Sequence, residues 1–161
     1  MTDRGDSGLR HLRADGSAHM VDVSAKDVTV RSASAAGRVL LSAVAVAALR
    51  RGDVPKGDAL SVARIAGIQA AKRTPELIPL AHPVGVHAVE VDLVVVDDGV
   101  ELTATVRTAD RTGVEMEALT AVSVGALALI DMVKAVDRQA RITDVRVTAK
   151  SGGRSGTWAE S

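Results

Sequence analysis

The run from Ala118 to Ile130 contains no charged side chain, and its only polar side chains are those of Thr120 and Ser123. A helix with apolar residues on nearly every side is typical of a buried core, so the rest of the fold must pack around it. Two acids precede the run, and an acid and a base follow it. The charged groups at the two ends of this core helix either emerge into solvent or lie at a partly desolvated site, where pKa values shift and catalysis is found.

The size and residue types of the chain point to one domain with an aliphatic core. Its 161 residues are enough to bury a continuous core. The chain has no cysteine, which excludes a disulfide framework, a cysteine nucleophile and Cys-ligated zinc. Trp158 is the only residue among Phe, Trp and Tyr, although 47% of the chain is hydrophobic. The core must therefore consist of Val, Leu, Ile, Ala and Met.

The charge pattern argues against two classes of partner. Twenty basic side chains balance twenty acidic ones, so no broad positive field is available for nucleic acid. Residues 1–17 are polar without an apolar leader, and no segment has about 18 consecutive apolar residues. We expect a soluble, cytoplasmic protein that binds neither nucleic acid nor membrane.

The chain reads as a flexible N-terminal tail over residues 1–18, one α+β domain over 19–150 and a Gly/Ser-rich tail over 151–161. Alternating residues predict a strand over 27–36, followed by a helix over 39–50. Asp58 is a suitable N-cap for a second helix that extends to Lys72.

The second half of the chain completes the fold prediction. Three prolines predict a non-helical loop over residues 74–84. Alternation on both sides of Asp97-Asp98-Gly99 predicts a hairpin, and a last strand covers residues 144–150. This order predicts a ferredoxin-like antiparallel sheet with helices on one face and an extra helix in the first crossover.

Asp131 and Lys134 are the first candidate catalytic pair. Their three-residue spacing places them on one helix face, where they can form an ion pair. A solvated surface pair would have the same spacing and would contribute little. Their position directly after the buried run favours a functional role.

Glu115 and Glu117 leave several interpretations open. They face different sides if the segment is helical and the same side if it is extended. Carboxylates at a helix N-terminus also stabilise the helix without any further role. A metal site would have to combine them with His82 and His87, and these two histidines need not face the same way.

The remaining candidate cations could each have an ordinary structural role instead of a functional one. Lys56 lies in a glycine-containing loop, where an amine is commonly solvated. His82 could be a structural histidine in the proline-rich segment. Lys150 and Arg154 flank Ser151-Gly152-Gly153, and such a segment can either bind an anion through backbone N–H groups or be a flexible tail.

Taken together, several motifs in this chain resemble one family. These motifs are Met20-Val21-Asp22-Val23-Ser24, Lys56-Gly57-Asp58, Leu77-Ile78-Pro79-Leu80-Ala81-His82-Pro83, Thr112-Gly113-Val114-Glu115-Met116-Glu117-Ala118-Leu119-Thr120, Asp131-Met132-Val133-Lys134-Ala135 and Ala149-Lys150-Ser151-Gly152-Gly153. They resemble molybdenum cofactor biosynthesis protein C, the cyclic pyranopterin monophosphate synthase family. The resemblance covers almost all of residues 20–156 and implies a phosphorus–oxygen lyase. Its substrate would be (8S)-3',8-cyclo-7,8-dihydroguanosine 5'-triphosphate, and its products cyclic pyranopterin monophosphate and pyrophosphate.

The resemblance also implies a role for each matching residue. It assigns acid and base chemistry to Asp131, Lys134 and Lys56, and phosphate contacts to Lys150 and Arg154. Two segments would contact the substrate, namely Leu80, Ala81 and His82 in one and Glu115, Met116 and Glu117 in the other. The family usually has cysteine at Ala81 and lysine at Arg154. Neither difference removes the chemistry, because arginine also binds phosphate and a replaceable cysteine is not a nucleophile.

The resemblance further implies an assembly and a cofactor requirement. The family forms a homo-hexamer, a trimer of dimers, with sites at subunit contacts. The sequence shows no metal site and no cofactor requirement, although Mg²⁺ could arrive on the substrate triphosphate. Two alternatives to an enzyme are a ferredoxin-like sensor of an anionic metabolite and a purely structural assembly protein.

Overall fold

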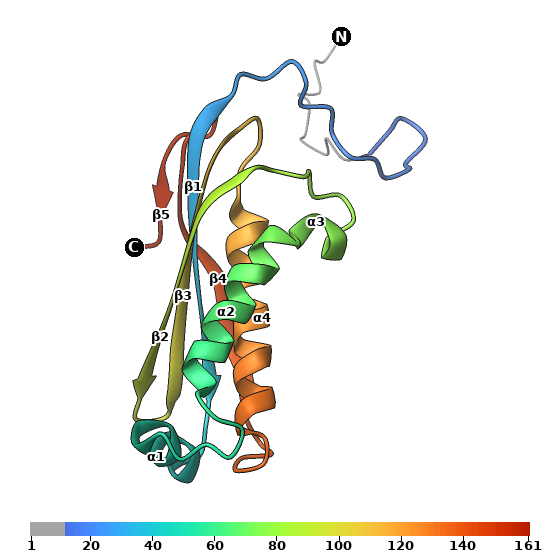
Figure 1. The fold of residues 1–161 in the computed structure, drawn as a ribbon. Helices are drawn as coiled ribbons and strands as arrows, with labels where there is room; N and C mark the ends of the chain where they lie inside the picture. The colour runs from blue at the N-terminus through green and yellow to red at the C-terminus, as the bar shows by residue number, and fades with distance from the viewer. Residues whose placement is uncertain (1–11) are drawn as a thin grey trace.

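A five-stranded antiparallel sheet with helices on one face forms the computed structural model, which describes residues 12–161 (Figure 1). The strand order is β2-β3-β1-β4-β5. The strands are β1 (Thr29–Leu40), β2 (Val86–Val96), β3 (Gly99–Asp110), β4 (Arg141–Ser151) and β5 (Trp158–Ala159). The helices are α1 (Ala43–Arg51), α2 (Ala59–Lys72), α3 (Thr74–Leu77) and α4 (Glu115–Val133). This arrangement confirms the predicted ferredoxin-like class and the extra helix in the first crossover.

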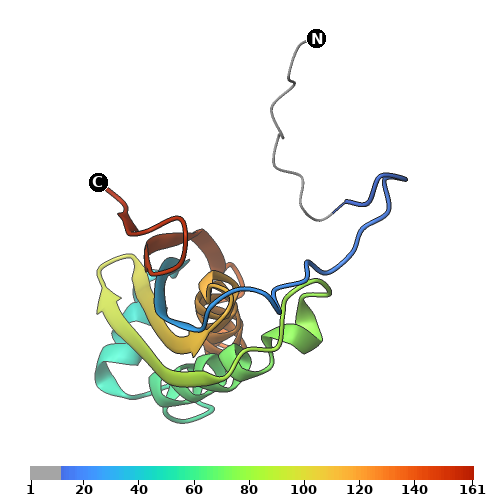
Figure 2. The ribbon, with the colours of Figure 1, turned by 90° about the horizontal axis from the view of Figure 1, so that it is seen from above.

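The core lies between the sheet and the two long helices, α2 and α4, which run side by side along the sheet (Figures 1 and 2). The inward residues of β1 and β3 are fully buried, including Val39, Val100 and Leu102. The uncharged run of α4 packs against them, with Ala118, Val122 and Leu129 inaccessible to solvent. The helix has the length and hydropathy of a membrane span, but 56% of its most apolar window is buried inside this fold. Its apolar character is therefore explained by the core.

Small residues allow α2 and α4 to approach closely. A Cβ added at Gly67 of α2 would lie 2.8 Å from the Ala121 carbonyl oxygen of α4. A Cβ added at Gly125 would lie 3.3 Å from the Ala63 carbonyl oxygen. The glycines therefore set the spacing of the two helices and fix where the ends of α4 lie.

Three local predictions need correction. The first strand extends to Leu40, so α1 begins at residue 43 rather than 39, with the Ser42 hydroxyl as its N-cap. The proline-rich segment is not wholly irregular, because Thr74–Leu77 forms α3 with Pro75 in its first turn. Proline is tolerated there because its missing N–H would have no helical partner. The strand β5 was not predicted, and it pairs Ala159 with Ala149 of β4.

Other predictions agree with the structure, and one region lies outside it. Asp58 caps α2 by accepting a hydrogen bond from the Ser61 N–H. The hairpin turns at Asp97-Asp98 as predicted. The predicted N-terminal tail falls mostly in residues 1–11, which lie outside the described residues. Within its remainder, the Arg13 N–H donates to the Ser17 carbonyl across a small turn.

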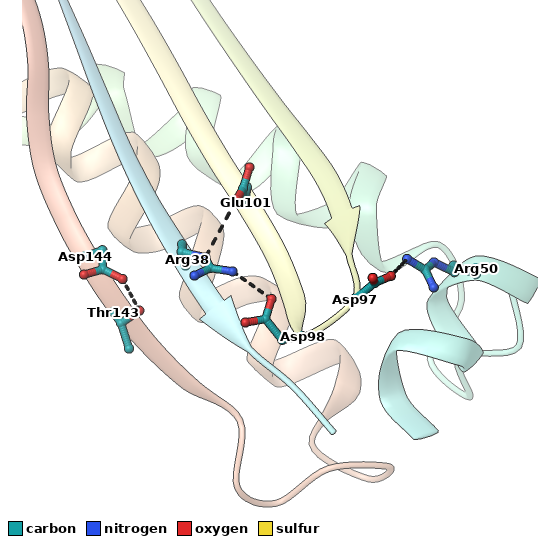
Figure 3. A network of polar contacts seen from close by, with 7 residues as sticks. All are labelled: Arg38, Arg50, Asp97, Asp98, Glu101, Thr143 and Asp144. Carbon is teal, nitrogen blue, oxygen red and sulfur yellow. Dashed lines mark hydrogen bonds and ion pairs between the residues drawn. The ribbon is translucent and has the colours of Figure 1, made fainter. Parts of the chain in front are cut away.

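Ion pairs fasten the hairpin end of the sheet (Figure 3). Arg38 of β1 contacts Asp98 at 2.7 Å and Glu101 at 3.8 Å. Arg50 of α1 contacts Asp97 at 2.9 Å. All of these carboxylates are well exposed, so the ion pairs help to position the hairpin and contribute little to the stability of the fold.

Candidate active site

A cavity of about 260 Å³ lies at the N-terminal end of α4, at the top of the molecule in Figure 1. Both predicted contact segments line it, one through Leu80, Ala81 and His82 and the other through Glu115, Met116 and Glu117. The first segment follows α3, and the second forms the first turn of α4. The remaining lining residues are Val21, Val23, Lys26, Thr112 and Gly113. The fold thus brings together two segments that are more than 30 residues apart in the sequence.

The two acids of the cavity have different surroundings. Because both lie in the first turn of a helix, they face different sides, which settles the geometry that the sequence left open. Glu115 is partly exposed and accepts a hydrogen bond from Lys150 Nζ at 3.0 Å. Glu117 is only 2% exposed, and its burial, reinforced by the charge of Glu115, raises the pKa of its carboxyl to about 7. One acid therefore holds a cation, while the other can carry a proton near neutral pH.

Arg154 lies beside this cavity rather than in it. It lines a neighbouring cavity of about 210 Å³ together with Lys26, Asp27 and Arg31. Gly153 has a φ of +74°, a backbone conformation that favours glycine, and it lies close to the guanidinium of Arg31. Lys26 lines both cavities and links them.

His82 has a defined partner at the edge of the cavity. Its Nε2 is within hydrogen-bonding distance of the Val21 carbonyl oxygen. A carbonyl can only accept, so this bond requires the proton on Nε2. His82 therefore fixes the segment that precedes β1 against the segment that follows α3.

The predicted catalytic residues meet at the opposite end of α4. Lys134 Nζ lies 2.7 Å from Asp131 Oδ1, and Lys56 Nζ lies 2.9 Å from Asp131 Oδ2. Hydrogen bonds from the two lysines hold the pKa of Asp131 below its usual range, and the bond from Lys134 has the larger effect. In one chain these three side chains are 41–59% exposed, so the charges at this end of α4 emerge largely into solvent.

The two groups of predicted residues are far apart within one chain. Glu115 and Asp131 are sixteen residues apart on one helix, which corresponds to about 24 Å. No side chain bridges such a distance. One copy of this chain therefore carries two separate polar clusters, at opposite ends of α4.

The metal interpretation finds no support in the described part of the chain. Residues 12–161 contain no group of three or more His, Asp or Glu side chains placed to hold a metal ion. His87 contacts the backbone N–H of Ala109 instead.

Sequence reasoning missed Lys26, Arg31 and Thr112 as residues of the cavities. Lys26 lies two residues after the motif Met20-Val21-Asp22-Val23-Ser24, and this position was the only available signal for it. Arg31 gave no signal, because it lies in a strand with alternating polar residues.

These features define a ferredoxin-like α+β protein with polar clusters suited to acid–base chemistry on a small anionic molecule. The sequence profile of the MoaC family matches residues 20–153. A protein of Streptomyces coelicolor named cyclic pyranopterin monophosphate synthase is 65% identical over 153 residues, which cover 95% of this chain and 90% of that protein. A Nocardioides protein of the same name is 62% identical and covers 94% of each chain. Cyclic pyranopterin monophosphate synthase 2 of Mycobacterium tuberculosis is 58% identical, over 93% of this chain and 90% of its own length. The chain belongs to the MoaC family.

Proposed function

We propose that this chain is a cyclic pyranopterin monophosphate synthase of molybdenum cofactor biosynthesis. It converts (8S)-3',8-cyclo-7,8-dihydroguanosine 5'-triphosphate to cyclic pyranopterin monophosphate and pyrophosphate, and it is therefore a phosphorus–oxygen lyase. Family membership and the names of its relatives support this proposal. The alternatives of a metabolite sensor and an assembly protein have no comparable support.

The observation that carries the proposal is the contact of two lysines with one carboxylate. Lys56 reaches Asp131 from a loop 75 residues earlier in the sequence, and Lys134 reaches it from the next helical turn. Rearrangement of a purine-derived ring requires proton transfers at several heteroatoms, which paired amines and acids can perform. Lys134 and Lys56 act as general acid and base, and Asp131 holds them in place.

The cavity at the other end of α4 binds the substrate. Leu80, Ala81 and His82 contact it from one side, and Glu115, Met116 and Glu117 from the other. Closure of the cyclic phosphate breaks a P–O bond and leaves negative charge on the departing pyrophosphate. Lys150 and Arg154 neutralise that charge, as preorganised cations do in phosphoryl chemistry.

A complete site requires two copies of the chain, because the two polar clusters of one copy are about 24 Å apart. We assign the protein to a homo-hexamer, a trimer of dimers, with each site at a subunit contact. Exposed apolar side chains on the outer surfaces of α2 and α4 support such contacts, among them Val62, Ile65 and Leu127. The reaction takes place in the cytoplasm without a metal held by the protein, and any Mg²⁺ enters on the triphosphate.

The test supplies purified protein with the cyclised triphosphate and follows pyrophosphate and pterin together. We expect the wild type to release both products and Lys134→Ala to release neither. Lys72→Ala is the matched control, because Lys72 is likewise an exposed lysine at the C-terminal end of a helix and has no ion pair within residues 12–161. A folded wild type that binds the compound without converting it would support the sensor instead.

A further inference from the structure

Residues 21–26, here called the strap, form one wall of the substrate cavity although they belong to no helix or strand. The strap is internally ordered, because the Ser24 N–H donates to Asp22 at 2.8 Å and the Lys26 N–H donates to the Val23 carbonyl at 3.0 Å. Figure 2 shows this part of the chain passing beside the segment that follows α3. Within residues 12–161 it pairs with no strand, so side chains that reach its carbonyl groups help to hold it in place.

Two side chains hold the strap, one at each end. His82 contacts the Val21 carbonyl at its beginning. At its end, Arg111 Nε donates to the Lys26 carbonyl at 2.9 Å. The second contact fixes the backbone of Lys26, whose side chain lines both cavities.

Asp110 connects Arg111 to an adjoining wall of the cavity, the segment of residues 78–85 that we call the proline loop. One Asp110 oxygen accepts the Arg111 N–H at 2.7 Å, and the other accepts the Gly85 N–H at 3.1 Å. Thr108 also donates to the Gly85 carbonyl at 2.6 Å. The end of β3 therefore holds the last residue of the proline loop and the last residue of the strap.

We propose that Asp110 and Arg111 are positioning residues that hold two adjoining walls of the substrate cavity in place by tying the strap and the proline loop to the end of β3. The proposal rests on the proposed function for the identity of the ligand. Neither residue belongs to the core: Arg111 is exposed and Asp110 is only partly buried. Their loss should therefore alter the walls of the cavity and leave the fold intact.

Arg111→Gln is the first variant, because it removes the charge and shortens the reach to the Lys26 carbonyl. We expect faster amide hydrogen exchange in a peptide covering residues 20–27 and unchanged exchange in α4. The Kd and KM for the cyclised triphosphate should rise about tenfold, the equivalent of one charge-assisted hydrogen bond. The kcat should change by less than about threefold, because no reacting group is removed.

Further variants separate positioning from general destabilisation. Arg111→Lys keeps a donor that reaches a carbonyl and should restore most of the affinity. Asp110→Asn keeps only one acceptor oxygen and should give an intermediate Kd. Arg107→Gln is the control, because Arg107 is exposed on the same strand and has no ion pair or side-chain hydrogen bond within residues 12–161.

The possible results distinguish failure of the positioning role from failure of the proposed function. Unchanged exchange in the strap, or faster exchange without a change in Kd and KM, would overturn the positioning role alone. The role also fails if Arg107→Gln weakens binding as much as Arg111→Gln does. A wild type that neither binds nor converts the triphosphate would overturn the proposed function, and the positioning role with it.

Discussion

Lys134, the residue that caps the C-terminal end of α4, places its Nζ 2.7 Å from Oδ1 of Asp131, three residues earlier in the chain. The second Asp131 oxygen accepts a hydrogen bond from Lys56. Both lysines therefore hold the pKa of Asp131 below its usual range, and this carboxylate stays ionised near neutral pH. In the proposed function it is a counter-ion that orients two amines, and the lysines transfer the protons.

The first prediction concerns this counter-ion. Asp131→Asn should lower kcat by about 10²–10³, part of the roughly 10²–10⁴-fold contribution of acid–base catalysis, because both lysines lose their common anchor. Steady-state kinetics of pyrophosphate release measures the effect. Asp97→Asn is the control, since Asp97 also forms an exposed ion pair, with Arg50, but lies at the hairpin (Figure 3). Equal kinetics for both variants would show that the Asp131 cluster is only a surface ion pair.

The second prediction uses the separation of the two polar clusters. The variants Lys134→Ala and Lys150→Ala should each lose most of the activity. Lys134→Ala removes a group at the C-terminal end of α4, and Lys150→Ala removes one at the N-terminal end. Co-expression of the two variants should restore activity. In a two-fold dimer with shared sites, random mixing leaves roughly a quarter of the sites without either substitution.

Two differently tagged chains let the mixed oligomers be purified and their composition verified by mass. If verified mixed oligomers stay as inactive as the separate variants, the two clusters do not combine across a subunit contact. Light scattering on the wild type checks the hexamer independently.

The third prediction concerns the buried acid, Glu117. Its pKa is raised from 4.5 to about 7, so the folded state binds the proton more tightly than the unfolded state. The resulting stability is fully present below pH 4.5 and is lost as the pH rises through 7. The loss at pH 8 is on the order of 3 kcal/mol. Glu117→Gln should therefore raise the free energy of unfolding at pH 8 and leave it nearly unchanged at pH 4.

Urea denaturation at both pH values, at one protein concentration, measures this difference. Glu76→Gln is the control, because Glu76 is exposed in α3. An equal gain from Glu117→Gln at pH 4 and pH 8 would contradict the assigned protonation.

Much of the fold could be predicted because its patterns are local. The alternation around Asp97-Asp98-Gly99 contains the hairpin, and the uncharged run contains the core helix. Asp58 and Ser61 are three residues apart, so the cap of α2 could also be recognised from the sequence. In contrast, β5 consists of two residues, and its pairing depends on a return of the chain that no periodicity records.

The site was harder to predict, because its contacts join distant parts of the chain. The motifs named Asp131, Lys134 and Lys56, but their spacing could not show that all three meet at the far end of α4 from His82. The contact of Arg111 with the Lys26 carbonyl links residues 85 positions apart. Every residue has a backbone carbonyl whatever its side chain, so no sequence pattern could indicate this contact.

The fourth prediction concerns the packing that places the ends of α4. Gly67→Ala should lower the free energy of unfolding by about 1–3 kcal/mol, the usual effect of overpacking. The new Cβ would lie 2.8 Å from the Ala121 carbonyl oxygen, and backbone cannot move aside as a flexible side chain can. Thermal unfolding against Gln69→Ala, an exposed change on the same helix, isolates the packing effect from helix propensity. Because alanine favours helix over glycine, a Gly67→Ala variant at least as stable as the wild type would show that the two helices separate at little cost.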